Sequence, residues 1–468
     1  MPEEAVLELI RREEIDFIDL RFTDLRGMWH GVTMTPEQLS LHRLKSGVPF
    51  DGSSYDGWTR PSQSDLVLIP DLDSAFVDPT RASATLVLLC GVETTDRSDF
   101  SVDPRSVLKR AEDYASRFKS ITGASVGAEL EFFLFDDVRY ENEYNRGSYY
   151  VDDVEAQYNS NQTYAGGNLG NRSILGQGLH DLPPADRGRD VREAIVKALK
   201  CSGVEVTKLH REGAAAQHEI GLAHGALLAS ADKIQVAKYV ARNAAFKAGK
   251  SLTFMPKPIA LGSGSGTHIN VSLNRSKKNI FAGEGYGGLA RDALYFIGGL
   301  LHHGAALNAL CNASTNSYKR LVPMVSMGMS YGYGYQNRKA IIRVPHFSDP
   351  ADARIEVRFP DATANPYLAI AAIVMAGLDG IENSIDPGRP QDESEGLTTP
   401  PPLARQQGRM AAHLGEALAV LNEDREFLMK GGVFSNALIN AYLIAKNADI
   451  VASTSAPTPV EFQNYYAC

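Results

Sequence analysis

Two glutamates at alternating positions are the first residues whose type and spacing indicate chemistry. Glu129 and Glu131 fall within 126–135, a segment otherwise rich in apolar residues. Successive side chains of a β-strand point to opposite faces, so a strand here places both carboxylates on one face. Carboxylates this close repel each other unless a cation lies between them. The pair therefore predicts a cation site, with a solvated strand face as the alternative.

A glycine-rich segment shows the same alternation. His268, Asn270 and Ser272 share one face of a predicted strand over 267–273, and Gly264 precedes it. Glycine permits close approach of the backbone to a ligand. Taken alone, the glycine run is as typical of a turn as of a phosphate loop, and a single histidine is more often structural. Together with the paired glutamates, the segment favours a ligand site.

A third segment, 354–360, alternates charged and apolar residues. Arg354, Glu356 and Arg358 share one face of the predicted strand. A surface row of ion pairs is the alternative, whereas the mouth of a ligand-filled barrel requires a strand with one charged and one apolar face. Further carboxylates and arginines of this kind are Glu212, Glu219, Arg338 and Arg343.

These residue types together suit phosphoryl transfer. Mg²⁺ and Mn²⁺ prefer oxygen ligands, and Mn²⁺ also accepts imidazole. Arginines hold phosphate oxygens through paired hydrogen bonds. Metal ions and arginines stabilise the charge that develops on a transferring phosphoryl group. The sequence has no G-x-x-x-x-G-K-[ST] phosphate loop and no kinase catalytic set, so a different phosphoryl-transfer fold is predicted.

Composition narrows the class of protein. The 468 residues are 44% hydrophobic and 22% charged, and the net charge of −9 argues against nucleic acid and anionic membranes as partners. The four cysteines form no C-x-x-C pair, which indicates reduced thiols in a cytoplasmic protein. We expect no signal peptide, and the longest apolar stretch, 367–378, is shorter than the roughly 20 residues that span a bilayer.

Hydrophobic periodicity predicts the elements that position these residues. A small α+β domain is expected over 1–103, with a helix at 3–12 and strands at 15–22, 65–69 and 84–89. A second domain over 104–468 begins with a helix at Pro104. Its clearest strands and helices are predicted at 126–135, 231–248, 267–273 and 366–378. The polar segments 140–184 and 384–402 are predicted surface loops.

The motifs together resemble those of the class I, bacterial type of the glutamine synthetase family. The matching segments follow the family's order and cover nearly the whole chain. They are Phe50-Asp51-Gly52-Ser53-Ser54, Glu129-Leu130-Glu131-Phe132-Phe133, Gln217-His218-Glu219, Phe254-Met255-Pro256-Lys257-Pro258, Gly264-Ser265-Gly266-Thr267-His268, Asn316-Ser317-Tyr318-Lys319-Arg320-Leu321-Val322-Pro323, Asn337-Arg338, Arg343 and 354–367. Each segment alone is a weak signal, whereas the ordered set is very specific.

The resemblance implies an α+β fold. An N-terminal β-grasp domain would precede a large α/β catalytic domain with an antiparallel strand funnel, the fold shared by glutamine synthetases and guanido kinases. The resemblance also implies a homo-oligomer of six-membered rings, usually two rings stacked as a dodecamer. Each active site would lie between neighbours, with Asp51 reaching the funnel of the adjacent subunit.

The resemblance implies roles for individual residues. The positions that match the ligands of one metal are Glu131, Glu212 and Glu219. Those that match a second metal site, nearer the ATP phosphates, are Glu129, His268 and Glu356. The positions that match contacts to ATP are Asn270, Ser272, Arg338 and Arg343, and those that match contacts to glutamate are Gly264, Arg320 and Arg358. The matched catalytic positions are Arg338 and Asp51, the latter a carboxylate that binds and deprotonates the amine.

The implied reaction has two steps and uses Mg²⁺ or Mn²⁺, with two or more ions per site. ATP phosphorylates the γ-carboxylate of L-glutamate, and an amine then attacks the acyl phosphate and releases phosphate. Metals and arginines stabilise the charge on the phosphoryl group, and a closed site excludes water. The expected partners are therefore ATP, L-glutamate and an amine or ammonia.

Three departures from the family's pattern bear on the substrate. Ser326 replaces the glutamate of a flap that helps to form the ammonium pocket, and methionines surround it. A less charged and more apolar pocket suits an alkyl or aryl amine better than ammonium. Ser263 replaces an asparagine that contacts glutamate. The loop near Gly396 lacks the tyrosine of enzymes regulated by adenylylation, so we expect no such control.

The sequence therefore predicts a γ-glutamylamide ligase that uses an organic amine. The first alternative is a true glutamine synthetase that uses ammonia. Alternatives from other classes are a non-catalytic assembly protein and a phosphotransferase on the same fold. The presence of all the matched metal-ligand positions argues against the former, and Asp51 and Arg320 argue against the latter.

Overall fold

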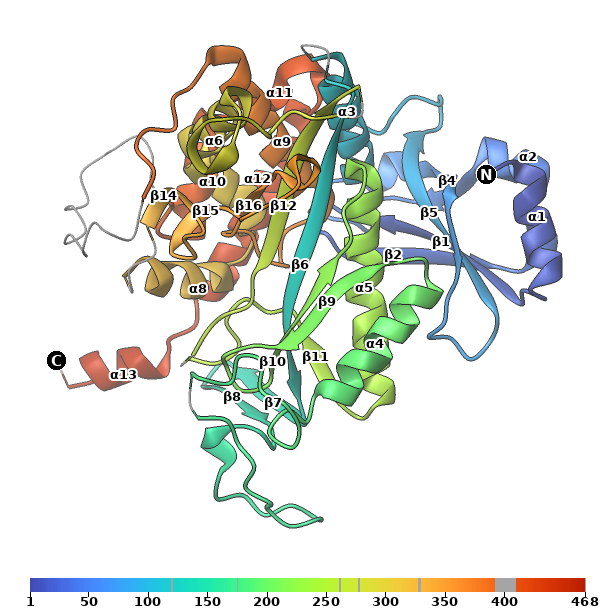
Figure 1. Cartoon of the computed structure of the whole chain (residues 1–468). Helices are drawn as coiled ribbons and strands as arrows, with labels where there is room; N and C mark the ends of the chain where they lie inside the picture. The colour runs from blue at the N-terminus through green and yellow to red at the C-terminus, as the bar shows by residue number, and fades with distance from the viewer. Residues whose placement is uncertain are drawn as a thin grey trace.

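A mixed sheet forms the N-terminal part of the chain (Figure 1, blue). In the computed structural model, the described residues are 1–118, 121–174, 176–260, 262–276, 278–326, 330–391 and 410–467, with only the backbone described for 322–326. The strands of this sheet lie in the order β2 (Trp29–Met34), β1 (Phe17–Thr23), β5 (Thr85–Thr94), β4 (Asp65–Val77) and β3 (Val48–Asp51). The central pair, β1 and β5, is parallel, and its neighbours are antiparallel. This is a β-grasp arrangement.

A second, larger sheet carries most of the candidate residues. Its strands follow the order β14 (Ser330–Tyr335), β15 (Ala340–Val344), β16 (Ile355–Val357), β12 (Thr267–Arg275), β6 (Gly123–Phe135), β10 (Gln217–Leu222) and β9 (Val206–Arg211). Two short strands pair at its margins, β11 (Ser251–Thr253) with β6 and β13 (Lys278–Asn279) with β12. Leu130, Ile269 and Val357 are buried on one face, and the charged residues alternate with them on the other.

The chain also forms helices along its length. They are α1 (Glu3–Arg12), α2 (Leu41–Ser46), α3 (Pro104–Arg117), α4 (Arg189–Cys201), α5 (Leu227–Lys247), α6 (Arg291–His302), α7 (Gly304–Cys311), α8 (Thr315–Ser326), α9 (Pro366–Asn383), α10 (Leu414–Glu423), α11 (Glu426–Met429), α12 (Asn436–Thr454) and α13 (Pro459–Tyr465). The most buried helix is α9, which begins at Pro366 behind the N-cap Asn365. It lies directly against α6, because a Cβ at Gly299 would be 2.0 Å from the carbonyl oxygen of Ala376.

Most predicted elements are confirmed, and two expectations are wrong. The segment 140–184 is not all loop, because β7 (Asp137–Glu143) and β8 (Arg146–Asp152) form a hairpin that is almost wholly exposed. The large sheet is antiparallel apart from β14 and β15, which run parallel. The strand predicted at 354–360 is limited to β16. The predicted loop at 384–402 falls mostly outside the described residues.

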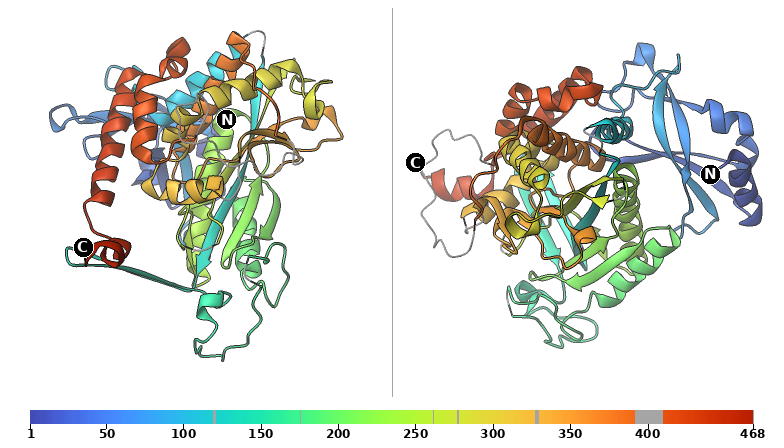
Figure 2. Two further views of the ribbon diagram at one scale, coloured as in Figure 1. Left: turned by 90° about the vertical axis from the view of Figure 1, so that its left-hand side faces the viewer. Right: turned by 45° about the horizontal axis from the view of Figure 1, so that its top comes forward.

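Two elements project from the body of the molecule. The β7–β8 hairpin exposes Tyr140 and Tyr149, and α13 extends beyond α12 near the C-terminus (Figures 1 and 2). Across the described ranges, no single helix has the length and apolar character needed to cross a membrane. Only α6 and α7 together pass that test, as a pair bent by 76°.

Candidate metal and phosphate site

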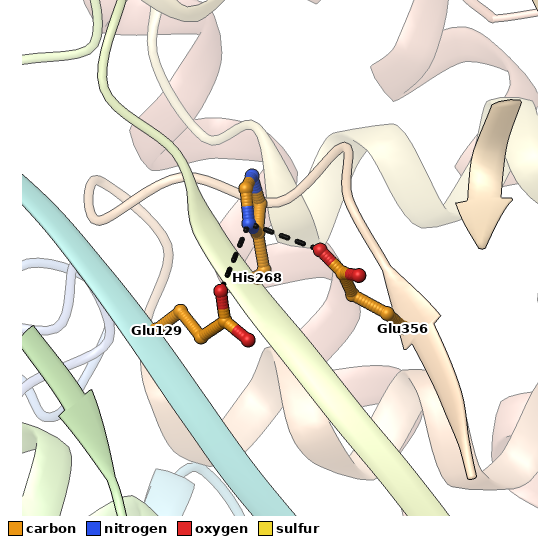
Figure 3. Close-up of side chains that lie close together, drawn as sticks. All are labelled: Glu129, His268 and Glu356. Atoms are coloured by element: carbon orange, nitrogen blue, oxygen red, sulfur yellow. Dashed lines mark ion pairs between the residues drawn. The ribbon is translucent and has the colours of Figure 1, made fainter. Parts of the chain in front are cut away.

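The first candidate group joins three strands of the large sheet. His268 on β12 lies directly opposite Glu129 on β6, and the next strand, β16, supplies Glu356. The Nδ1 atom of His268 is 3.3 Å from Oε1 of Glu356 and 3.8 Å from Oε2 of Glu129 (Figure 3). This nitrogen is buried and has no hydrogen-bond partner among the described residues. A buried imidazole nitrogen that faces two carboxylates fits a divalent cation.

A second candidate group lies on β9 and β10. Glu219 is directly opposite His210, and Glu212 follows the end of β9. His210 Nδ1 is 3.3 Å from Oε1 of Glu212, and Nε2 is 3.4 Å from Oε1 of Glu219. Burial, reinforced by the charges of Glu131 and Glu219, raises the pKa of Glu212 to about 7. This crowding of carboxylates also fits a cation.

His210 was absent from the sequence prediction. Its place two residues before Glu212 was a weak signal, and its direct pairing with Glu219 across two strands becomes visible only in the fold. Hydrogen bonding to Glu219 raises the pKa of His210, although burial opposes the shift.

Glu131 borders both groups. It lies opposite Glu219 on the neighbouring strand, and its Oε1 is 3.7 Å from Nε2 of His268. Its other oxygen accepts hydrogen bonds from the backbone N–H of Gly266 at 2.7 Å and from Nε2 of Gln217 at 3.3 Å. In the structure, His210 rather than Glu131 completes the close group with Glu212 and Glu219.

Arginines and an asparagine surround the first group. Arg343 on β15 donates to Oε2 of Glu356 at 2.7 Å, and Arg358 donates to Oε1 of the same carboxylate. Burial alone would raise the pKa of Glu356, but His268 and the two arginines lower it overall. Asn270 on β12 donates to Oε1 of Glu129 at 3.1 Å. The surrounding donors and positive charges thus favour the ionised forms of Glu129 and Glu356.

Arg320 lies beneath the glycine-rich segment. It is 3% exposed, and its guanidinium donates to the carbonyl oxygens of Phe359 at 2.8 Å and Arg358 at 3.0 Å. A Cβ at Gly264 would be 2.9 Å from Cγ of Arg320, and one at Gly266 would be 2.4 Å from Nη2. Glycine is therefore required for this close packing.

The same face has donors that no described residue satisfies. The buried Nε atoms of Arg320, Arg343 and Arg358 have no hydrogen-bond partner in the described part of the chain. Ser272 is buried on the face of β12 that carries His268. Buried guanidinium donors without partners favour anionic ligands at this face.

Three predicted site residues do not join these groups in a single chain. Asp51 is exposed at the end of β3 in the N-terminal sheet, where its carboxylate accepts from N and Oγ of Ser53. Arg338 is exposed in the turn between β14 and β15. Ser326 ends α8, and its side chain lies outside the described residues.

The sequence prediction also missed a lysine. Lys208 on β9 places its ammonium 3.0 Å from Oε2 of Glu129 and 3.0 Å from Oε1 of Glu219. It therefore touches one carboxylate of each candidate group. Burial alone would raise the pKa of Glu129, but His268 and Lys208 lower it overall.

The face of the large sheet that carries these glutamates, histidines and arginines, here called the strand floor, lies beside a β-grasp sheet and suits the binding of cations and phosphate groups. The family model described as the glutamine synthetase catalytic domain matches residues 101–465, and that of the glutamine synthetase beta-Grasp domain matches residues 14–95. The chain therefore belongs to the glutamine synthetase family.

Similarity to individual relatives extends over whole chains. The sequence is 42% identical over 469 residues to the glutamine synthetase of Escherichia coli K12 and 43% identical over 469 residues to that of Vibrio cholerae, with 100% of each chain covered. Among solved structures, Plasmodium falciparum glutamine synthetase superposes with a TM-score of 0.89 at 26% identity, covering 100% of this chain and 99% of that one. GmaS without ligand superposes with a TM-score of 0.81 at 28% identity, covering 99% of both chains.

Proposed function

We propose that this protein phosphorylates the γ-carboxylate of L-glutamate with ATP and joins the resulting acyl phosphate to an organic amine. The observation that carries the proposal is the pair of carboxylate–histidine groups on one strand floor, flanked by arginines whose Nε atoms are buried. Cations and guanidinium groups on one face suit the transfer of a highly charged phosphoryl group.

Two divalent cations, Mg²⁺ or Mn²⁺, are assigned to this floor. Glu129, His268 and Glu356 hold one, and Glu212 and Glu219 hold the other, with Glu131 beside both and His210 as an added donor. The partnerless Nδ1 of His268 supports this assignment. When bound, the ions supply Lewis-acid stabilisation of the phosphate charge.

The arginines are assigned to the anionic substrates. Arg343 and Arg338 bind the ATP phosphates, with Arg338 also stabilising the transferring group, and Asn270 and Ser272 contact the nucleotide. Arg320 and Arg358, with the backbone at Gly264, hold glutamate. Arg320 is buried and Arg358 is half-buried, and each has a buried Nε without a partner among the described residues, which supports the binding of an anion by both.

The amine entrance is assigned to the segment beside Glu212. The carbonyl oxygen of Gly178 accepts from Arg211 Nη1 at 2.8 Å, and the N–H of His180 donates to the Arg211 carbonyl oxygen at 3.2 Å. These bonds hold the backbone of residues 178 and 180 against Arg211, the residue before Glu212, and Leu179 between them is 48% exposed. An exposed apolar side chain here, and Ser326 in place of a flap glutamate, favour an organic amine over ammonium.

Ammonia is the second candidate nucleophile. The full-length relatives at 42–43% identity are glutamine synthetases by name, whereas GmaS is similar at 28%. An ammonia-using enzyme with an altered flap is therefore the competing proposal.

A complete active site is proposed to need two subunits. Asp51 lies at the exposed end of β3, and we assign it to binding and deprotonating the amine in a neighbouring subunit. We place this contact in hexameric rings stacked as a dodecamer, with a β-grasp domain over 1–103 and a catalytic domain over 104–468. We place the enzyme in the cytoplasm, and the buried free thiols of Cys90 and Cys311 support a reducing compartment.

An amine panel tests the proposed function. Phosphate release from ATP would be measured with Mg²⁺ and L-glutamate in the presence of ammonia, alkylamines, polyamines, ethanolamine or anilines, for the native chain and for Ser326→Glu. We expect an organic amine to be the preferred substrate and Ser326→Glu to shift the preference toward ammonia. A native preference for ammonia would make the enzyme a glutamine synthetase and would reject the role given to Ser326.

A further inference from the structure

Lys208 joins the two candidate metal groups. Its ammonium is 3.0 Å from Oε2 of Glu129 in the first group and 3.0 Å from Oε1 of Glu219 in the second. Both carboxylates are largely buried, with side-chain exposures of 19% and 6%, whereas 46% of the lysine side chain is exposed. The lysine thus reaches inward from the rim and places one positive charge where carboxylates of both groups meet.

A glycine on the intervening strand makes this reach possible. In the paired strands, Gly221 on β10 lies opposite Glu129 on β6 and opposite Lys208 on β9. A Cβ at Gly221 would be 2.9 Å from Cγ of Lys208 and 3.1 Å from its Cε. The methylene chain of Lys208 therefore lies across the backbone of β10 at Gly221. The side chain crosses this strand, so that its ammonium reaches Glu129 on β6.

This geometry gives Lys208 a role distinct from that of a ligand. An ammonium has no lone pair for a metal, and it uses the same oxygen atoms that a divalent cation needs. We propose that Lys208 is a tethered counter-cation that competes with the divalent ions for Glu129 and Glu219 and thereby lowers the metal affinity of the nucleotide-free enzyme. This inference rests on the metal assignment made under the proposed function.

The proposal has a clear physical rival. Lys208 could instead hold the two carboxylates in the arrangement that the metals require, as an organising residue. In that case its removal would release mutual repulsion between Glu129 and Glu219 and would weaken metal binding. The competition proposed here predicts stronger metal binding after removal of Lys208, because the two carboxylates then have no ammonium to neutralise them and their oxygens are free for the divalent cation.

Titration of the full-length protein with Mn²⁺, followed by electron paramagnetic resonance in the absence of nucleotide, separates these outcomes. We expect Lys208→Met, which keeps the stem and removes the charge, to bind Mn²⁺ about tenfold more tightly than the native chain. Lys208→Arg, which keeps a cation, should stay near the native affinity. Gly221→Ala should resemble Lys208→Met, because the added methyl group displaces the lysine stem.

The matched control is Lys250→Met. Lys250 also forms an ion pair, with Asp136 beyond the far end of β6, and its loss should leave Mn²⁺ affinity unchanged. Thermal unfolding and oligomer size would establish that each variant is folded. Equal or weaker Mn²⁺ binding by folded Lys208→Met would overturn the competition. Absence of Mn²⁺ binding in both the native chain and Lys208→Met would instead reject the underlying metal assignment.

Discussion

Glu129 and His268 are direct cross-strand partners on β6 and β12, and His268 Nδ1 lies 3.8 Å from Oε2 of Glu129. This pairing brings the alternating polar residues of segments 126–135 and 267–273 together on one face of the large sheet. Because side chains alternate along each strand, the same register brings Asn270 opposite Glu356 on the next strand. Glu129 and Glu356 are therefore positioned by regular strand pairing rather than by loops, which gives the first group a rigid base.

Replacement of Glu131 tests the metal assignment. Its carboxylate borders both groups and is fixed by Gly266 and Gln217. We expect Glu131→Ala to lower phosphate release by more than about 100-fold, because loss of even an indirect metal contact commonly costs 10–100-fold. The control is Glu141→Ala on the exposed hairpin, which should retain native turnover. Near-native turnover in Glu131→Ala would contradict the two-metal floor.

Replacement of Arg320 tests the glutamate assignment. Arg320→Lys keeps the charge but loses the planar fork that donates to three carbonyl oxygens and that we assign to a substrate carboxylate. We expect KM for glutamate to rise about 10- to 100-fold, while KM for ATP changes less than about threefold. Arg189→Lys, on the exposed part of α4, is the control. A rise in KM for ATP alone would move Arg320 to the nucleotide.

Mixed oligomers test whether two subunits build one site. Asp51 lies on the β-grasp sheet and Glu131 on the large sheet, so a site between subunits takes them from different chains. Subunits carrying Asp51→Asn and subunits carrying Glu131→Ala should each be inactive. After dissociation and random reassembly of the two, about one quarter of the sites should be free of both changes and active. Persistent inactivity of verified mixed oligomers would place both residues in the same chain's site.

A buried carboxyl away from the site predicts how stability depends on pH. Burial, and then the charge of Glu155, raises the pKa of Asp153 to about 7, compared with about 4 in an unfolded chain. Between about pH 4 and 7, the folded state therefore keeps a proton on Asp153 that the unfolded state releases. This carboxyl group thus lowers the free energy of unfolding as the pH rises through that range.

Asp153→Asn should remove this contribution to the decline. Relative to the native chain, we expect the variant to gain roughly 2–3 kcal/mol of unfolding free energy between pH 5 and pH 8. Denaturant unfolding at both pH values measures the difference, with the exposed Asp137→Asn as the control. If the variant and the native chain instead differ in unfolding free energy by the same amount at pH 5 and at pH 8, Asp153 is ionised in the folded protein at both pH values.

Regular strand periodicity explains why much of the floor could be predicted. Glu129, Glu131, His268 and Glu356 lie on strands whose apolar partners alternate with them, so their shared face follows from sequence. Their mutual distances depend on strand order, which joins β12 to β6 and β16 although these strands are far apart in the chain. The resemblance to the family predicted that Glu129, His268 and Glu356 share a metal site, whereas the strand order itself is known only from the structure.

Other parts of the site had little or no local signal. His210 and Lys208 can be recognised as site residues only from the pairing of β9 with β10. Lys208 reaches Glu129 across Gly221, and nothing in the sequence distinguishes this glycine from others. The β7–β8 hairpin escaped prediction because neither of its faces is buried. Cross-strand neighbours and exposed strands both require the fold before they can be recognised.

Transfer of oxygen from glutamate to phosphate tests the central claim most directly. If the γ-carboxylate attacks ATP and an amine then expels phosphate, one carboxylate oxygen must leave with the phosphate. Glutamate labelled with ¹⁸O in the γ-carboxylate, incubated with ATP, Mg²⁺ and the preferred amine, should yield phosphate carrying one ¹⁸O atom together with a γ-glutamylamide. Unlabelled phosphate, or a phosphorylated amine in its place, would contradict ligation through an acyl phosphate.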